Sequence, residues 1–111
     1  MEATINPAIE PIVREFKTAL QAMYGDRLRE VILYGSYARG DYDDESDIDL
    51  MVVLSDEKVN TIGEVWKMGD LTTGLLFDYG KVISVLPVAA SRFTTSYMPV
   101  YQNARREGIM L

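Results

Sequence analysis

The segment between residues 30 and 54 constrains the fold of this chain most, because two short apolar runs flank a strongly acidic one. Glu30–Tyr34 is rich in β-branched and aromatic residues, is apolar on both faces and stops at Gly35, so it predicts a central strand. Asp47–Leu54 alternates acidic and apolar residues before it becomes wholly apolar, and it predicts a second strand. The polar stretch Arg39–Ser46 between them predicts a surface loop.

The rest of the chain adds helices and one more strand. Apolar residues recur at helical spacing in three places, and a β-branched run lies between the last two of them. The order helix, strand, strand, helix, strand, helix predicts an α+β fold, with a small mixed β-sheet and helices packed on one face. The predicted segments are a helix over 9–24, a helix over 60–76, a strand over 81–88 that we expect to end near Pro87, and a helix over 98–106 followed by an apolar tail.

Length and composition fit one folded domain over residues 1–111. The chain has 48% hydrophobic and 25% charged residues, which is typical of a globular domain. The N-terminus lacks a basic start followed by an apolar run, and no long apolar stretch follows, so we expect a cytoplasmic protein that does not contact membranes. Trp66 lies at helical spacing with Ile62 and Val65, and we expect it in the core or at an interface.

Two residue types are missing, and their absence excludes several chemistries. Without cysteine the chain has no disulfide, no zinc–thiolate site and no thiol nucleophile. Without histidine it has no Ser-His-Asp triad and no imidazole base. Any metal ion must therefore be held by oxygen ligands, which favours magnesium, manganese or calcium.

The net charge of −6 comes from one local cluster. Removing its six acidic residues from the total of 17 leaves 11, which balances the 11 basic residues. The sequence has no basic patch typical of nucleic-acid binding, so we expect no direct contact with nucleic acid. The cluster consists of Asp41, Asp43, Asp44, Glu45, Asp47 and Asp49.

The combination of a Gly-Ser turn and an Asp-x-Asp pair carries the chemistry. Gly35 follows a strand directly, where a residue without a Cβ lets the backbone approach a ligand, and Ser36 begins what we predict to be a short helix. The free N–H groups at such a turn favour phosphate. Asp47 and Asp49 are two apart on a strand, so their carboxylates project from the same face and can bind one hard cation. The two strands must pair side by side for these halves to meet.

The acidic residues also have interpretations that need no catalytic role, and these fit some members of the cluster better than others. The acids of the loop 41–45 are interpreted as a solvated surface. A calcium loop of the EF-hand type fits poorly, because the sixth position from Asp41 is serine and the twelfth is valine. Asp47 and Asp49 are different, because apolar neighbours draw them into the start of a strand, where unpaired carboxylates are costly without a cation.

These residues resemble the signature of a known family. Gly35-Ser36, Ala38-Arg39-Gly40 and Ser46–Leu50 together resemble the DNA polymerase β-type nucleotidyltransferase superfamily, and the chain is similar in length to the minimal nucleotidyltransferase (MNT) antitoxins of HEPN/MNT toxin–antitoxin pairs. The resemblance implies that Asp47 and Asp49 are catalytic and bind Mg²⁺, and that Gly35 and Ser36 contact the phosphates of ATP. Arg39 lies three residues after Ser36 and could reach a phosphate.

The same resemblance implies a reaction and a partner. Family members transfer AMP from ATP to a hydroxyl, and in HEPN/MNT pairs the acceptor is a tyrosine of the toxin, a ribonuclease that the modification silences. The expected assembly is therefore a hetero-oligomer with a HEPN-type toxin. A third reading, transfer of AMP to a small molecule, would need an acceptor-binding domain for which 111 residues leave no room.

One position departs from the family pattern. Members place a third carboxylate on a later strand, facing the first two, and the matching position here is Ser84. Three alternatives follow: two carboxylates and the metal suffice, the acceptor protein brings its own base, or the chain has weak or no transferase activity. In the last case it would be an antitoxin that neutralises its toxin by direct binding.

Overall fold

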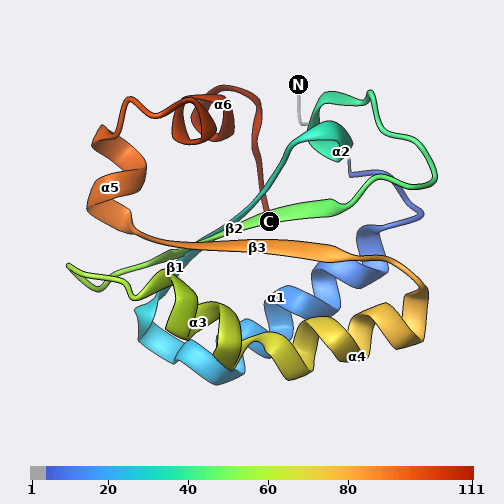
Figure 1. The fold of residues 1–111 in the computed structure, drawn as a ribbon, viewed down its shortest axis with the longest axis horizontal. Coiled ribbons are helices and arrows are strands. Elements are labelled where there is room, and N and C mark those ends of the chain that lie inside the picture. Colours follow the sequence, from blue (N-terminus) through green and yellow to red (C-terminus); the bar gives the residue numbers. More distant parts are fainter. Residues whose placement is uncertain (1–4) are drawn as a thin grey trace.

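A mixed sheet of four strands in the order β3-β2-β1-β4 forms the centre of the computed structural model, which describes residues 5–111 (Figure 1). β1 is antiparallel to both β2 and β4, whereas β2 and β3 are parallel. The first four residues of the expected domain, and with them the start of the N-terminus, lie outside the described residues. The strands are β1 (Leu28–Tyr34), β2 (Ile48–Leu54), β3 (Ile83–Ala89) and β4 (Ile109–Met110).

The helices lie on both sides of this sheet (Figure 1). Three of them, α1, α3 and α4, lie below the sheet in the view of Figure 1, and α2, α5 and α6 lie above it. A 3₁₀ turn, η1, joins α1 to β1. The bounds are α1 (Glu10–Tyr24), η1 (Gly25–Arg27), α2 (Ser36–Arg39), α3 (Thr61–Lys67), α4 (Gly69–Tyr79), α5 (Ala90–Thr95) and α6 (Pro99–Glu107).

The main core lies between α1, α4 and one face of the sheet. The strands contribute alternate residues to this face, as a pleated strand requires, and α1 contributes a helical stripe. Phe16 and Leu20 of α1 are fully buried against Leu33 and Leu50. The predicted mixed sheet and α+β class are confirmed.

A second, smaller core lies on the opposite face, which the sequence did not predict to carry helices. Met51 and Val53 of β2 pack there against Phe93 of α5 and against Tyr101 and Ala104 of α6. The six residues of α5 are too few to show a clear helical period. α5 and α6 cover the part of this face around Met51 and Val53, and Tyr34 and Val100 pack at its margin. Beyond this margin Asp47 is exposed and Asp49 is half-buried.

The region predicted as one helix over 60–76 is two helices that meet at Met68. Met68 and Leu75 are the residues that reach the core, whereas Ile62 and Trp66 are 73% and 80% exposed. Trp66 is therefore not a core residue. The residues at helical spacing lie on the outer surface of α3, so the core alternative is wrong and the interface alternative stays a prediction.

The last two strands differ from the prediction: β3 begins two residues later and ends one residue later than expected, and β4 was predicted only as an apolar tail. β3 continues through Pro87, which is possible because β3 is an edge strand and proline's missing N–H is not needed there. The apolar tail forms β4, whose Ile109 pairs with Leu33. Among residues 5–111, no helix is long and apolar enough to cross a membrane.

Candidate active site

Asp49 lies at the centre of the open end of the sheet. Across the antiparallel pair it faces Tyr34, the last residue of β1, and across the parallel pair it faces Ser84 of β3. The predicted pairing of the two strands that flank the acidic loop is therefore confirmed. Asp47, two residues earlier, lies on the same side of the sheet as Asp49. The topology thus brings the Gly-Ser turn and the Asp-x-Asp pair together.

Position 35 requires glycine for two reasons, its backbone conformation and the close approach of Asp49. It has φ +73° and ψ −154°, a combination that L side chains rarely adopt. A Cβ at this position would lie 2.3 Å from Oδ2 of Asp49 and 3.1 Å from its Cγ. The Asp49 carboxylate therefore occupies the space that a side chain would fill, and it lies against the turn that leads into Ser36.

A hollow of about 450 Å³ opens between this turn and α6. It is lined by four of the five predicted site residues, which are Gly35, Ser36, Arg39 and Asp49. Tyr34, which directly precedes Gly35, also lines it. The sequence did not single out Val100 and Asn103, which line it from α6, because they lie far from the motif in the chain and belong to no motif of their own.

Asp47 lies at the open margin of the site, where its side chain contacts β3. The hydroxyl of Ser84 donates a hydrogen bond of 3.4 Å to Oδ2 of Asp47. Ser84 thus stands beside the two aspartates, where the family pattern has a third carboxylate. Within residues 5–111, no cluster of three or more acidic side chains is arranged to hold a metal ion, so the candidate ligands are this pair.

Burial and charge shift the acid–base properties of the site. Burial, with the nearby charge of Asp47, raises the pKa of Asp49, and the charge of Arg39 opposes this shift. Burial and the Asp49 carboxylate raise the pKa of Tyr34 to about 12. The Tyr34 phenol therefore stays protonated near neutral pH and does not act as a base. Two adjacent carboxylates, one of them partly desolvated, form an environment that a cation would stabilise.

Arg39 borders the hollow, but acidic side chains already hold its guanidinium. Its Nε lies 3.1 Å from Oδ2 of Asp41, and its Nη1 lies 3.6 Å from Oε2 of Glu107. These contacts are half-exposed, where an ion pair contributes little to stability. Arg39 can therefore exchange a carboxylate for a phosphate at little cost.

The acidic loop over residues 41–46 is held in place beside the site, and its carboxylates are exposed. The ring of Tyr42 stacks on Tyr37 of α2, with ring centroids 4.5 Å apart. Nζ of Lys81 donates to the backbone oxygen of Asp44 at 3.1 Å. The loop thus spans from α2 to the start of β3, and it places negative charge along the open side of the site.

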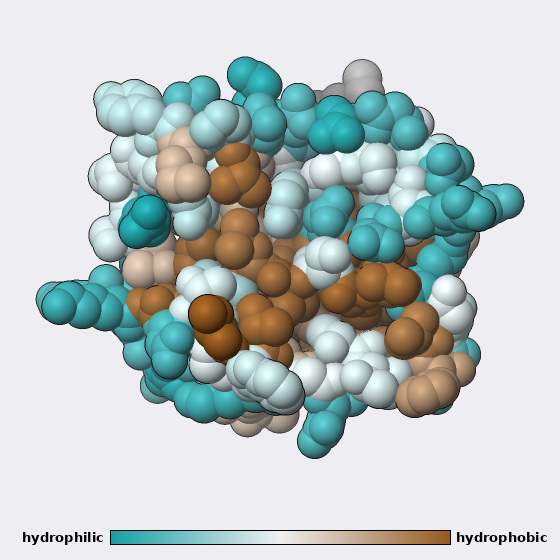
Figure 2. All heavy atoms as spheres, viewed as in Figure 1, coloured by the Kyte–Doolittle hydropathy of each residue, from teal (hydrophilic) through white to brown (hydrophobic). Residues whose placement is uncertain are grey.

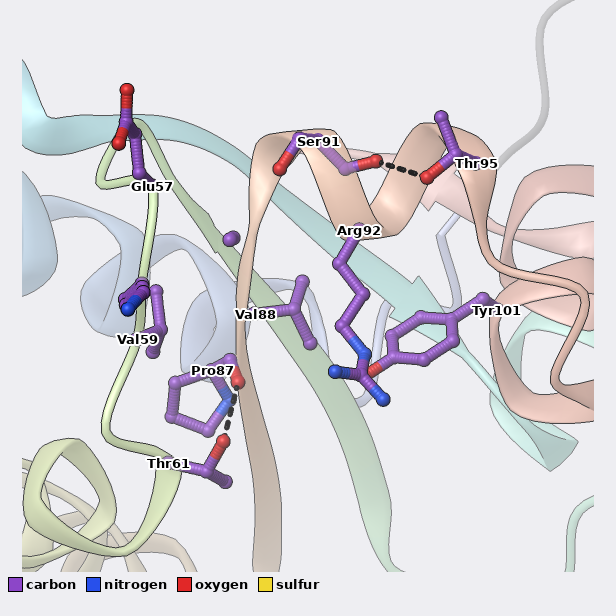
Figure 3. A pocket seen from close by; sticks show the side chains of 11 residues that line it. Glu57, Val59, Thr61, Pro87, Val88, Ser91, Arg92, Thr95 and Tyr101 are labelled. Carbon is purple, nitrogen blue, oxygen red and sulfur yellow. Dashed lines mark hydrogen bonds between the residues drawn. The ribbon is translucent and has the colours of Figure 1, made fainter.

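A second hollow of about 630 Å³ lies at the other end of β3 and shares no residue with the first. Pro87 and Val88 form its floor, and the loop before α3 forms one wall (Figure 3). Arg92 of α5 and Tyr101 of α6 point toward each other on the opposite side (Figure 3). None of the predicted site residues lies there, so this hollow is not part of the candidate active site.

Comparison with known proteins identifies the family. The model of the nucleotidyltransferase domain family matches residues 13–89, which include β1, β2 and the whole Gly-Ser and Asp-x-Asp region. The chain therefore belongs to the nucleotidyltransferase domain family, and it is a nucleotidyltransferase. Two relatives from Methanocaldococcus jannaschii, each named "putative protein adenylyltransferase", are 37% and 34% identical to it. The first alignment covers 92% of this chain and 96% of the relative, and the second covers 83% and 90%.

Solved structures share the fold at lower identity. An MNT antitoxin in complex with a tri-AMPylated HEPN toxin of Shewanella oneidensis superposes with a TM-score of 0.52 at 17% identity, over 89% of this chain and 69% of that one. A toxin–antitoxin structure with AMP-PNP gives a TM-score of 0.58 at 19% identity, over 85% and 68%. A minimal nucleotidyltransferase matches over 100% and 97%, with a TM-score of 0.54 at 21% identity.

Proposed function

We propose that this chain transfers AMP from ATP to a tyrosine hydroxyl of a HEPN-type toxin, and so acts as an Mg²⁺-dependent antitoxin. The observation that carries the proposal is the close approach of the Asp49 carboxylate to Gly35, because it sets a candidate metal ligand against a turn suited to phosphate. The names of the archaeal relatives support a protein as the acceptor. The shared fold of MNT antitoxins solved with HEPN toxins supports the class of partner.

Asp47 and Asp49 would hold the Mg²⁺. They fit this ion because their donors are carboxylate oxygens, which Mg²⁺ prefers, and because Asp49 lies in β2 and Asp47 lies just before it, beside Ser84 of β3. The two negative charges repel each other and Asp49 is partly buried, so a bound cation would stabilise the ionised pair. When bound, the ion neutralises phosphate charge and stabilises the charge that develops as the α-phosphate is attacked.

The nucleotide would occupy the hollow between the Gly-Ser turn and α6. The first backbone N–H groups of α2 have no partners within the helix and can bind phosphate oxygens together with the hydroxyl of Ser36. Arg39 can leave Asp41 to pair with a phosphate oxygen. Asn103 and Val100 on the opposite wall would contact the sugar or the base.

The reaction replaces a phosphoanhydride bond of ATP with a phosphoester bond to tyrosine. The tyrosine oxygen attacks the α-phosphorus, the bond from that phosphorus to the β-phosphate oxygen breaks, and pyrophosphate leaves with the bonding electrons. Ser84 cannot take the phenolic proton as a carboxylate would, and its hydroxyl instead orients Asp47. The proton would pass to water or to a base of the acceptor protein.

A second candidate function follows from Ser84. Without a third carboxylate the chain could be an antitoxin that neutralises its toxin by direct binding alone. The exposed carboxylates of the acidic loop over residues 41–46 would serve either function, because they could face the basic, RNA-binding surface of a ribonuclease. Both candidate functions place the protein in the cytoplasm, as a single domain in a hetero-oligomer that does not itself bind nucleic acid.

The two candidates differ in what remains after the proteins are separated. The HEPN-type protein is incubated with this chain, ATP and Mg²⁺, and the tagged chain is then stripped away before ribonuclease activity is measured. A covalent modification keeps the toxin inactive after separation, whereas simple occlusion lets its activity return. Asp49→Asn should convert the first result into the second. If the toxin regains full activity after treatment with the unaltered chain, the transferase proposal is wrong.

A further inference from the structure

The outer edge of β3 has backbone groups that nothing in the described chain uses. β3 is the last strand of the sheet, so only its inner edge pairs, with β2. The N–H of Ile48 donates to the oxygen of Val82, and in a parallel pair every second residue continues this pattern. Ser84 and Leu86 therefore face β2, whereas the N–H and C=O groups of Ile83 and Val85 point outward. Among residues 5–111, no hydrogen bond to these outward groups is present.

The open edge has a defined length. Pro87, the next residue in the outward series, has no N–H, and its carbonyl accepts a hydrogen bond of 3.4 Å from Thr61 Oγ1. At its other end the open edge begins next to Val82, whose side chain is 47% exposed. Figure 2 shows hydrophobic surface across the middle of the face along which β3 runs in Figure 1. An edge with free backbone groups and apolar flanks is a template for one more strand.

This edge is continuous with the site of AMP transfer. A strand added outside β3 would place one of its residues opposite Ser84, with its side chain on the face of Asp47 and Asp49. Its Cα would lie two strand spacings, about 10 Å, from that of Asp49. A long side chain that leans over the small Ser84 can cover this distance, whereas a serine hydroxyl would fall short.

We propose that the acceptor protein docks by adding an extended segment to the outer edge of β3, with its tyrosine opposite Ser84. This inference rests on the proposed function for the identity of the acceptor. It adds to that function the place on the chain where the acceptor binds. The hollow at the other end of β3 then receives a side chain further along the same segment, because Pro87 and Val88 form both the end of the edge and the floor of the hollow (Figure 3). Backbone hydrogen bonds would supply affinity, and this hollow would supply specificity.

A second copy of this chain is a poorer occupant of the edge. Antiparallel pairing of two β3 strands through the free groups of Ile83 and Val85 would set Ser84 of one copy against Ser84 of the other. It would bring together the Asp47–Asp49 pairs of two chains that each carry a net charge of −6. It would also close the side of the site through which a protein acceptor enters.

One pair of variants separates the backbone from the side chain. Val85→Pro removes an outward N–H without removing a bond to β2, as Pro87 already does two residues later. Val85→Ala loses comparable packing but keeps the N–H, so it is the matched control. Val85→Pro should lower kcat/KM for AMP transfer to the HEPN-type protein about tenfold relative to Val85→Ala. Equal values for the two variants, with both folded, would overturn the inference while leaving the proposed function intact.

Amide hydrogen exchange tests the same edge without any need for catalysis. The Ile83 and Val85 amides should exchange fast in the free chain and about tenfold more slowly with the purified HEPN-type protein, whereas Ser84 and Leu86 should be slow in both. If the unaltered chain modifies no acceptor, the proposed function fails, but this measurement still decides where the partner docks. Unchanged exchange at Val85 would refute strand addition, and so would protection that depends only on the concentration of this chain.

Discussion

Gly35→Ala should damage the stability of the fold and the site together, because one Cβ creates two separate problems. The alanine would sit at φ +73° and ψ −154°, a region that costs a non-glycine residue about 1–3 kcal/mol. Its Cβ would also lie 2.3 Å from Oδ2 of Asp49, so that side chain must leave its rotamer at about 1 kcal/mol. A total near 3 kcal/mol corresponds to a melting temperature roughly 12 °C lower for a domain of this size.

Thermal unfolding and AMP transfer are the two assays, and Gly80→Ala is the control. Gly80 also has a positive φ of +71°, but nothing lies within 4 Å of the place its Cβ would take. Gly80→Ala should therefore cost only about 1 kcal/mol of backbone strain, near 4 °C, and leave transfer unchanged. Gly35→Ala should also lose transfer activity at temperatures where it is fully folded.

A double-mutant cycle identifies the contact that causes the larger loss. In the Gly35→Ala background, Asp49→Ala removes the overlapping carboxylate and should recover about 1 kcal/mol of stability beyond its effect in the unaltered chain. Additive effects of the two substitutions on the free energy of unfolding would show that the Gly35–Asp49 contact is not responsible. The reasoning about the site would then be refuted.

Four further predictions concern Ser84 and Asn103 in the site and the buried Tyr24–Glu64 pair. Ser84→Asp would add a third carboxylate next to Asp47, so without metal it should lower the melting temperature, and Mg²⁺ should raise that temperature more than in the unaltered chain. Asn103→Ala should raise the KM for ATP about 3- to 10-fold and barely change kcat, as measured by steady-state kinetics. Tyr24→Phe removes the donor of the buried 2.5 Å bond to Glu64 and should cost about 1–3 kcal/mol in urea unfolding, with no loss of transfer. Burial raises the pKa of Glu64, but the Tyr24 hydroxyl, Lys67 and Arg27 together lower it by more, so the pKa of Glu64 lies below its ordinary value. That stabilisation is present above about pH 4.3 and is lost as the pH falls through the lower folded-state pKa, so Glu64→Gln should flatten the acid limb of the stability profile.

The sequence predicted the parts of this molecule that local chemistry determines. The first helix, the two strands beside the acidic loop and the Gly35–Asp49 neighbourhood follow from periodicity, turn residues and the need of carboxylates for a cation. Asn103 and Val100 could not be predicted, because only the packing of α6 across the sheet brings them to the hollow. The core position expected for Trp66 is wrong, since helical spacing alone does not say which face of α3 meets the sheet, whereas its position at an interface stays a prediction.

The intact mass of the HEPN-type protein after incubation with this chain, ATP and Mg²⁺ tests the central claim most directly. Asp47→Asn and Asp44→Asn run beside the unaltered chain, because the first alters a proposed metal ligand and the second an exposed acid of the loop. The account predicts a gain of one or more AMP units with the unaltered chain and with Asp44→Asn, and none with Asp47→Asn. No gain with the unaltered chain, or an undiminished gain with Asp47→Asn, would contradict it.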